Sequence, residues 1–192
     1  AREGWPRPLL RTVYIGGGTP SLLGTGAMER LAAAIARYAD VEPAAEWTAE
    51  ANPESFTSDV ANDWTAAGIN RISLGVQTFH EPALRWMGRL HGADGPGRAV
   101  AVARDAGLSN ISVDLIFGLP AHLGRDWGAD LDRAAALAPE HVSLYGLTAE
   151  AGTPLGRRVQ AGQEALADED SYGAQFRLAA ERLGAAGFVH YE

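Results

Sequence analysis

Three consecutive glycines near the start of the chain are the residues best suited to holding a ligand. Gly16, Gly17 and Gly18 follow a β-branched and aromatic run at 12–15 and precede Thr19-Pro20-Ser21. Without side chains, their amides and carbonyls are open to a bound molecule, whereas a simple turn usually needs one glycine. A P-loop would require lysine, which the chain lacks, and a dinucleotide fingerprint would require glycine at Ser21. The pattern therefore favours a ligand loop of another kind.

Polar side chains gather on one face of the strands expected at 46–53, 70–77, 110–117 and 141–147. Side chains alternate between faces along a strand. That face carries Thr48, Glu50, Arg71, Ser73, Gly75, Gln77, Ser112, Asp114, Ser143 and Tyr145. Parallel sheets covered on both faces, and closed eight-stranded barrels, fill such positions with apolar residues. We therefore expect a wet or ligand-filled inner face.

The glycine loop and the larger polar side chains lie toward the carboxyl ends of the strands, where parallel α/β folds bind ligands. The residues concerned are Gly16 to Thr19, Glu50, Gln77, Asp114 and Thr148. Each has a simpler interpretation by itself: Glu50 as a rim charge, Gln77 as a helix cap, and Asp114 as a partner of Arg71 or Arg89. Their convergence on one rim favours a shared binding site.

The elements that must position these residues alternate along the chain. Helices are expected at 28–38, 57–67, 81–90, 98–106, 126–137 and 168–186, with a long polar loop over 148–167. A further strand is expected to begin at Val189. Repeated β-α units of this size predict an α/β fold with a parallel sheet and helices outside.

Composition excludes several classes of function. A formal charge of −8 argues against nucleic-acid or anionic-membrane partners, and no apolar run reaches the ~20 residues of a membrane span. The chain has no cysteine, so this stretch offers neither a disulfide nor a thiolate-bound metal. The five histidines lack zinc-ligand spacing. We expect no metal site and a cytoplasmic protein.

Six ordered segments carry a family resemblance. They are Gly16 to Ser21, Glu50 to Pro53, Arg71 to Phe79, Met87 to His91, Asp114 to Pro120, and His141 to Thr148 with Gly152 to Leu155. The series resembles the radical S-adenosylmethionine (SAM) proteins of the oxygen-independent coproporphyrinogen III oxidase family. The last segment is more similar to the HemW haem-chaperone branch than to the decarboxylase branch. The resemblance extends from Thr12 to Glu192.

This resemblance implies a partial (β/α)6 barrel of six strands that binds SAM and a [4Fe–4S] cluster. Residues 1–192 would form one radical SAM core fragment. The glycine loop of the family holds the methionine end of SAM, so Gly17, Gly18 and Thr19 inherit that role. Further cofactor-binding positions of the family match Glu50, Gln77, Arg89 and Asp114, and Thr148 would lie at the same site.

The sequence differs from the family in having no cysteine. In the family, the cluster is held by a Cys-x3-Cys-x2-Cys loop that precedes the glycine loop. Cleavage of SAM requires an electron from that cluster. Either the chain is a fragment, incomplete at both ends and without the first cluster-binding strand and the C-terminal domain, or its protein has lost the cluster. The fragment is the favoured interpretation, and by itself it should be inactive.

Two functions of the parent protein remain open, besides a degenerate SAM-binding barrel. One is a haem chaperone that delivers haem to acceptor proteins, and the other is a decarboxylase of coproporphyrinogen III. A decarboxylase must bind the propionates of a porphyrinogen through cations. The rim segments offer only Arg85 and Arg125, with Arg89 assigned to SAM, which favours the haem-handling branch.

Overall fold

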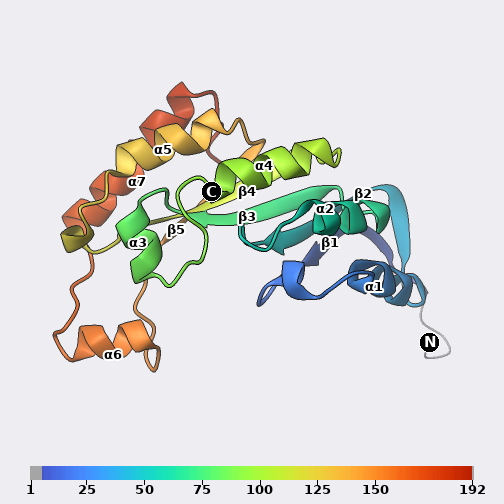
Figure 1. The fold of residues 1–192 in the computed structure, drawn as a ribbon, viewed down its shortest axis with the longest axis horizontal. Helices are drawn as coiled ribbons and strands as arrows, with labels where there is room; N and C mark the ends of the chain where they lie inside the picture. The colour runs from blue at the N-terminus through green and yellow to red at the C-terminus, as the bar shows by residue number, and fades with distance from the viewer. Residues whose placement is uncertain (1–5, 192) are drawn as a thin grey trace. The chain divides into compact units, whose positions relative to one another are not determined.

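The computed structural model describes residues 6–191 (Figure 1), in which strands and helices alternate as the sequence predicts. The strands are β1 (Leu9–Ile15), β2 (Asp40–Ala51), β3 (Arg71–Gln77), β4 (Asn110–Phe117) and β5 (His141–Gly146). The α-helices are α1 (Ala27–Ala36), α2 (Ser58–Ala66), α3 (Glu81–Trp86), α4 (Gly95–Asp105), α5 (Trp127–Ala136), α6 (Pro154–Gln160) and α7 (Glu169–Ala185). Two short 3-10 turns occupy Pro20–Leu22 and Ala121–Leu123.

The strands follow one another in the sheet in the order β1-β2-β3-β4-β5, as expected of successive β-α units. β1 and β2 run parallel, with Val13 opposite Trp47, and so do β2 and β3, with Ala49 opposite Ile72. The predicted α/β architecture with a parallel sheet is confirmed.

The chain divides into two compact units. The first unit contains residues 6–75 and 95–112, and its apolar core includes Met28, Ala49, Ile72 and Ile111, all at most 1% exposed. The rings of Phe56 and Trp64 meet edge to face at 5.4 Å between centroids. The helices of this unit are α1, α2 and α4.

The second unit contains residues 76–94 and 113–191. Val113, Leu115 and Phe117 alternate along β4 and are buried, as the strand periodicity predicts. Helices α5 and α7 lie side by side (Figure 1), with Leu131 and Ala179 in the buried core. None of the helices within residues 6–191 is long and apolar enough to cross a bilayer.

Two element boundaries differ from those expected. β2 begins at Asp40 rather than at 46, because residues 40–41 pair with Leu9 and Leu10 before an irregularity in the register. Pro43 falls in this irregular stretch, where a missing N–H is tolerated. Helix α4 begins at Gly95 rather than at 98, which places Pro96 in its first turn, where proline is favoured.

The expected loop over 148–167 is wrong, because it contains α6. The Oγ1 of Thr153 accepts a 3.0 Å hydrogen bond from the N–H of Gly156, and Pro154 starts the helix. The strand expected from Val189 is also absent over residues 188–191, and Glu192 lies outside the described residues.

Candidate functional site

The glycine loop after β1 presents open backbone. Gly17 and Gly18 have φ angles of +90° and +63°, which glycine adopts without strain. A Cβ added to either residue would meet no atom within 4 Å. Packing against the rest of the chain therefore does not explain these glycines, and the space beside their backbone is free for a ligand.

Glu50, near the end of β2, is anchored to this loop. Its Oε2 accepts a 3.0 Å hydrogen bond from the N–H of Gly17, and its Oε1 accepts a 2.7 Å bond from the hydroxyl of Tyr14. A Cβ on Gly16 would lie 2.8 Å from Oε1 of Glu50 and 2.8 Å from the ring of Tyr14. A side chain at position 16 would therefore displace both of these groups, and the carboxylate is held at the loop.

A second set of contacts ties the loop to the segment that follows β2. The Nδ2 of Asn52 donates a 3.3 Å hydrogen bond to Oγ1 of Thr19, and the hydroxyls of Ser21 and Ser55 lie 2.5 Å apart. The first unit therefore brings the glycine loop, Thr19 and Glu50 together. These are half of the predicted cofactor-binding residues.

The other predicted residues belong to the second unit. Gln77 ends β3 and is 9% exposed, and Asp114 is half-buried on the neighbouring strand β4. Arg89 follows α3 and is half-buried, and its backbone N–H donates a 2.9 Å hydrogen bond to the carbonyl of Leu84. Thr148 is exposed and donates a 3.3 Å hydrogen bond to Oε1 of Glu150. A single site made of all these residues stays a prediction.

Gln77 has an unusual backbone conformation. Its φ is +67°, and the N–H of Thr78 donates a 2.8 Å hydrogen bond to the carbonyl of Val76. A hydrogen bond across one central residue with positive φ is the rare, strained form of the γ-turn. The direction of the Gln77 side chain is therefore set by a backbone conformation that non-glycine residues seldom adopt.

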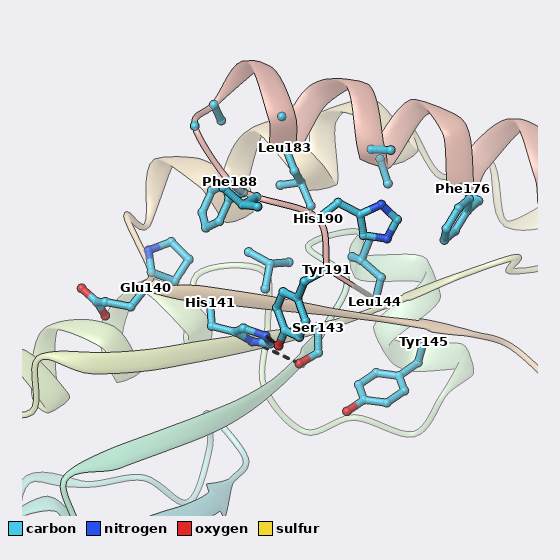
Figure 2. A pocket seen from close by; sticks show the side chains of 18 residues that line it. Glu140, His141, Ser143, Leu144, Tyr145, Phe176, Leu183, Phe188, His190 and Tyr191 are labelled. Atoms are coloured by element: carbon cyan, nitrogen blue, oxygen red, sulfur yellow. Dashed lines mark hydrogen bonds between the residues drawn. The ribbon is translucent and has the colours of Figure 1, made fainter. Parts of the chain in front are cut away.

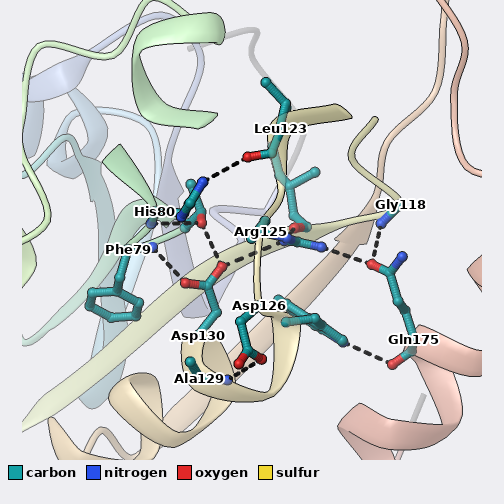
Figure 3. Close-up of polar contacts among 12 residues, drawn as sticks. Phe79, His80, Gly118, Leu123, Arg125, Asp126, Ala129, Asp130 and Gln175 are labelled. Carbon is teal, nitrogen blue, oxygen red and sulfur yellow. Dashed lines mark hydrogen bonds and ion pairs between the residues drawn. The ribbon is translucent and has the colours of Figure 1, made fainter. Parts of the chain in front are cut away.

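A buried polar cluster adjoins this turn (Figure 3). The guanidinium of Arg125 lies 3.6 Å from the carboxylate of Asp130, and both side chains are 4% exposed. Burial raises the pKa of Asp130, while hydrogen bonds from Thr78 and Phe79 and the charge of Arg125 act in the opposite direction. Burial likewise lowers the pKa of Arg125, against the attraction of Asp130.

A cavity of about 820 Å³ lies elsewhere in the second unit, between β5, α7 and the segment after α7 (Figure 2). Its lining includes His141, Phe176 and Tyr191, and the Nε2 of His141 lies 2.6 Å from the hydroxyl of Tyr191. None of the predicted cofactor-binding residues lines it. Over residues 6–191 no cluster of three or more histidines or carboxylates is arranged to hold a metal ion.

Comparison with known proteins identifies the family. The model of the radical SAM superfamily matches residues 1–134. The chain belongs to the radical SAM superfamily. The glycine loop and Glu50 lie within the matched residues, as do Gln77, Arg89 and Asp114.

Among curated radical SAM relatives, the chain is 40% identical over 188 residues to the haem chaperone HemW of Mycobacterium tuberculosis, covering 96% of this chain and 47% of that protein. It is 39% identical over 183 residues to HemW of Escherichia coli, covering 95% and 47%. The chain thus spans about half the length of the curated relatives it matches. The predicted resemblance to this family and to its HemW branch is confirmed.

Solved structures confirm the predicted fold class. The coproporphyrinogen III oxidase HemN of Escherichia coli matches with a TM-score of 0.79 at 24% identity, covering 94% of this chain and 42% of that one. The Elp3 protein of Methanocaldococcus infernus matches with a TM-score of 0.72 at 19% identity, covering 92% and 46%. At these identities the likeness shows the radical SAM barrel fold alone.

Sequence reasoning missed several residues around the predicted site. Tyr14 lies opposite Thr48 in the parallel register, so strand parity could have placed it on the face of Glu50. Asn52 stands two residues beyond Glu50 in a segment already singled out. Arg125 and Asp130 had no such signal, because a charged pair near a helix start usually indicates an exposed surface.

Proposed function

We propose that this chain is the SAM-binding part of a cytoplasmic haem chaperone of the HemW type, which transfers haem to acceptor proteins. The observation that carries the proposal is its 40% identity to HemW along 96% of the chain. The chain spans about half the length of these relatives. The haem-chaperone activity is therefore proposed for the whole protein and not for this chain by itself.

The geometry of the first unit fits the methionine end of SAM, which carries an ammonium and a carboxylate. Glu50 supplies an anion beside the open glycine backbone, where it would pair with the ammonium. Gly17, Gly18 and Thr19 would contribute backbone and hydroxyl groups there. Gln77, Arg89, Asp114 and Thr148 are assigned to the same ligand, with Arg89 as the cation for its carboxylate.

The residues present do not fit the [4Fe–4S] cluster of the superfamily. Such clusters are held by cysteine thiolates, and the sequence has no cysteine. None of the residues present can hold the cluster whose electron SAM cleavage requires, so their proposed role is SAM binding.

The environment of the arginines favours haem handling over decarboxylation of coproporphyrinogen III. Arg125, expected as a rim cation, is buried and donates hydrogen bonds to the carbonyl of Ile116 at 2.6 Å and to Oε1 of Gln175 at 2.8 Å. Arg85 is exposed but lies 3.5 Å from the carboxylate of Glu81. Arg125 is thus withdrawn from propionate binding, which weakens the case for a site that grips a tetracarboxylate.

The proposal is tested on the protein expressed from its complete reading frame. We expect saturable haem binding at micromolar or tighter affinity in a difference-absorbance titration. We expect no protoporphyrinogen from coproporphyrinogen III in an anaerobic assay with SAM and a reductant. Multiple-turnover decarboxylation would overturn the chaperone assignment.

SAM binding is tested separately by equilibrium dialysis of the 192-residue chain against labelled SAM. Saturable binding that unlabelled SAM displaces and ATP does not is the expected result. Binding that fails to saturate, or that ATP displaces equally, would contradict the proposed site.

A further inference from the structure

The strained turn at Gln77 needs a structural cause. A non-glycine residue with positive φ is unfavourable and persists only where its surroundings hold it. The central residue of this turn is also one of the residues assigned to SAM. The contacts that hold the turn are therefore candidates for controlling the ligand site.

Asp130 makes those contacts from helix α5. Its Oδ2 accepts a 2.5 Å hydrogen bond from the hydroxyl of Thr78, and its Oδ1 accepts a 2.9 Å bond from the N–H of Phe79. The same hydroxyl of Thr78 accepts a 3.1 Å bond from the N–H of His80. One carboxylate thus anchors the two residues immediately after Gln77.

Arg125 connects this carboxylate to the end of β4 (Figure 3). Besides Asp130, its guanidinium binds the carbonyl of Ile116, the penultimate residue of β4, and Oε1 of Gln175 on α7. That Gln175 oxygen also accepts a 3.0 Å bond from the N–H of Gly118. The guanidinium further stacks on the ring of Trp127 at 4.6 Å, which restricts its orientation.

We propose that Asp130 and Arg125 are a positioning pair that holds the strained turn at Gln77 and fixes the adjoining end of β4, and so sets the SAM-facing geometry of Gln77. The inference rests on the proposed function where it involves SAM. The pair is proposed to act through Gln77 and is not itself assigned to the ligand. A gain in folding stability is a weak explanation for such a pair, because proteins in which apolar residues replace a buried ion pair are often at least as stable.

The first test alters Thr78, whose side chain is fully buried. Thr78→Val keeps the shape but removes the hydroxyl, whereas Thr78→Ser retains it. We expect T78V to weaken SAM binding about fivefold or more, which corresponds to the net free energy of one hydrogen bond. We expect T78S, which keeps the hydroxyl, to bind SAM within about twofold of the unsubstituted chain. Equilibrium dialysis measures the affinity, and circular dichroism verifies folding of each variant.

The matched control is Thr65→Val on α2. It removes a hydroxyl that bonds the carbonyls of Ala61 and Asn62 at 3.1 Å each, within its own helix. We expect T65V to leave SAM affinity unchanged. If T78V loses thermal stability but keeps SAM affinity, the cluster is structural only and the positioning role is overturned.

The second test needs no ligand. Gln77→Gly and Gln77→Ala both remove the side chain, but only glycine relieves the strain of a positive φ. We expect Q77G to melt at a higher temperature than Q77A when Thr78 is present. In the T78V background this advantage should shrink, because the turn is then free to relax.

An equal advantage of glycine in both backgrounds would show that the hydrogen bond from Thr78 to Asp130 does not hold the turn, and would overturn the proposal. The two measurements separate this inference from the proposed function. Lack of SAM binding by the unsubstituted chain would overturn the proposed function and the SAM role of the pair. The melting-temperature cycle decides by itself whether the hydrogen bond from Thr78 to Asp130 holds the turn.

Discussion

Oε2 of Glu50 accepts a 3.0 Å hydrogen bond from the backbone N–H of Gly17. The two residues are 33 positions apart in sequence and meet because β1 and β2 are adjacent and parallel. The hydroxyl of Tyr14 occupies the other carboxylate oxygen at 2.7 Å. The result is an oriented negative charge beside open glycine backbone.

Replacing the charge of Glu50 tests its role. Glu50→Gln keeps the shape and an acceptor for Gly17, but it cannot neutralise the ammonium of SAM. Because hydrogen bonds to charged groups contribute roughly 1.5–3 kcal/mol, we expect SAM affinity to fall about tenfold or more. Glu54→Gln, at an exposed position in the loop after β2, should leave the affinity unchanged in the same dialysis assay. Equal losses in both variants would contradict the assignment.

Adding a methyl group to the glycine loop separates strain from ligand contact. Gly17→Ala and Gly24→Ala both place alanine at positive φ, +90° and +79°, and neither Cβ would meet an atom within 4 Å. We expect each to lose about 1 kcal/mol of unfolding free energy. Only G17A should also weaken SAM binding, because its methyl group enters the ligand space. A G24A variant with the same binding defect would argue against a local site.

Two aspartates on helix α5 should differ strongly in their effect on stability. Asp130→Asn leaves the buried Arg125 without its charge partner, and such a loss costs about 3–5 kcal/mol. Asp132→Asn removes an exposed ion pair with Arg182 at 2.8 Å, so its effect on unfolding free energy should be much smaller. Urea unfolding of both variants measures the difference. Similar losses would mean that Arg125 is satisfied without Asp130.

The start of helix α7 should contribute to acid sensitivity. Hydrogen bonds from the backbone N–H and side chain of Ser171 lower the pKa of Asp168 below its ordinary value. A lowered pKa stabilises the fold above the unfolded value of about 3.9, and this contribution is lost as pH falls through the folded value.

Urea unfolding from about pH 5 to pH 3 tests this contribution. Asp168→Asn keeps an N-cap acceptor but removes the titrating group, so its stability should decline less steeply than that of the unsubstituted chain. Asp170→Asn, in the first turn of the same helix, is the control. A decline that D168N leaves unaltered would assign the acid sensitivity to other carboxylates.

The sequence by itself determined most elements of the fold and the family. Strand periodicity located β3 and β4, because alternation depends on residues close in the chain. Thr153-Pro154 was an equally local signal for α6, but the charged and polar residues around it favoured a loop. The glycine loop and Glu50 could be singled out because both stand where strands end.

Only the tertiary structure decided how these groups are held. The contact between Glu50 and Gly17 depends on the register of two strands, which no local pattern specifies. Arg125 reads as an exposed rim cation in sequence, yet it is buried against Asp130 and the end of β4. Thr78 and Asp130 are 52 residues apart, and the folded chain places them in contact directly beside Gln77, whose φ is positive. Burial and long-range hydrogen bonding depend on which segments meet in the folded chain, so spacing along the chain does not encode them.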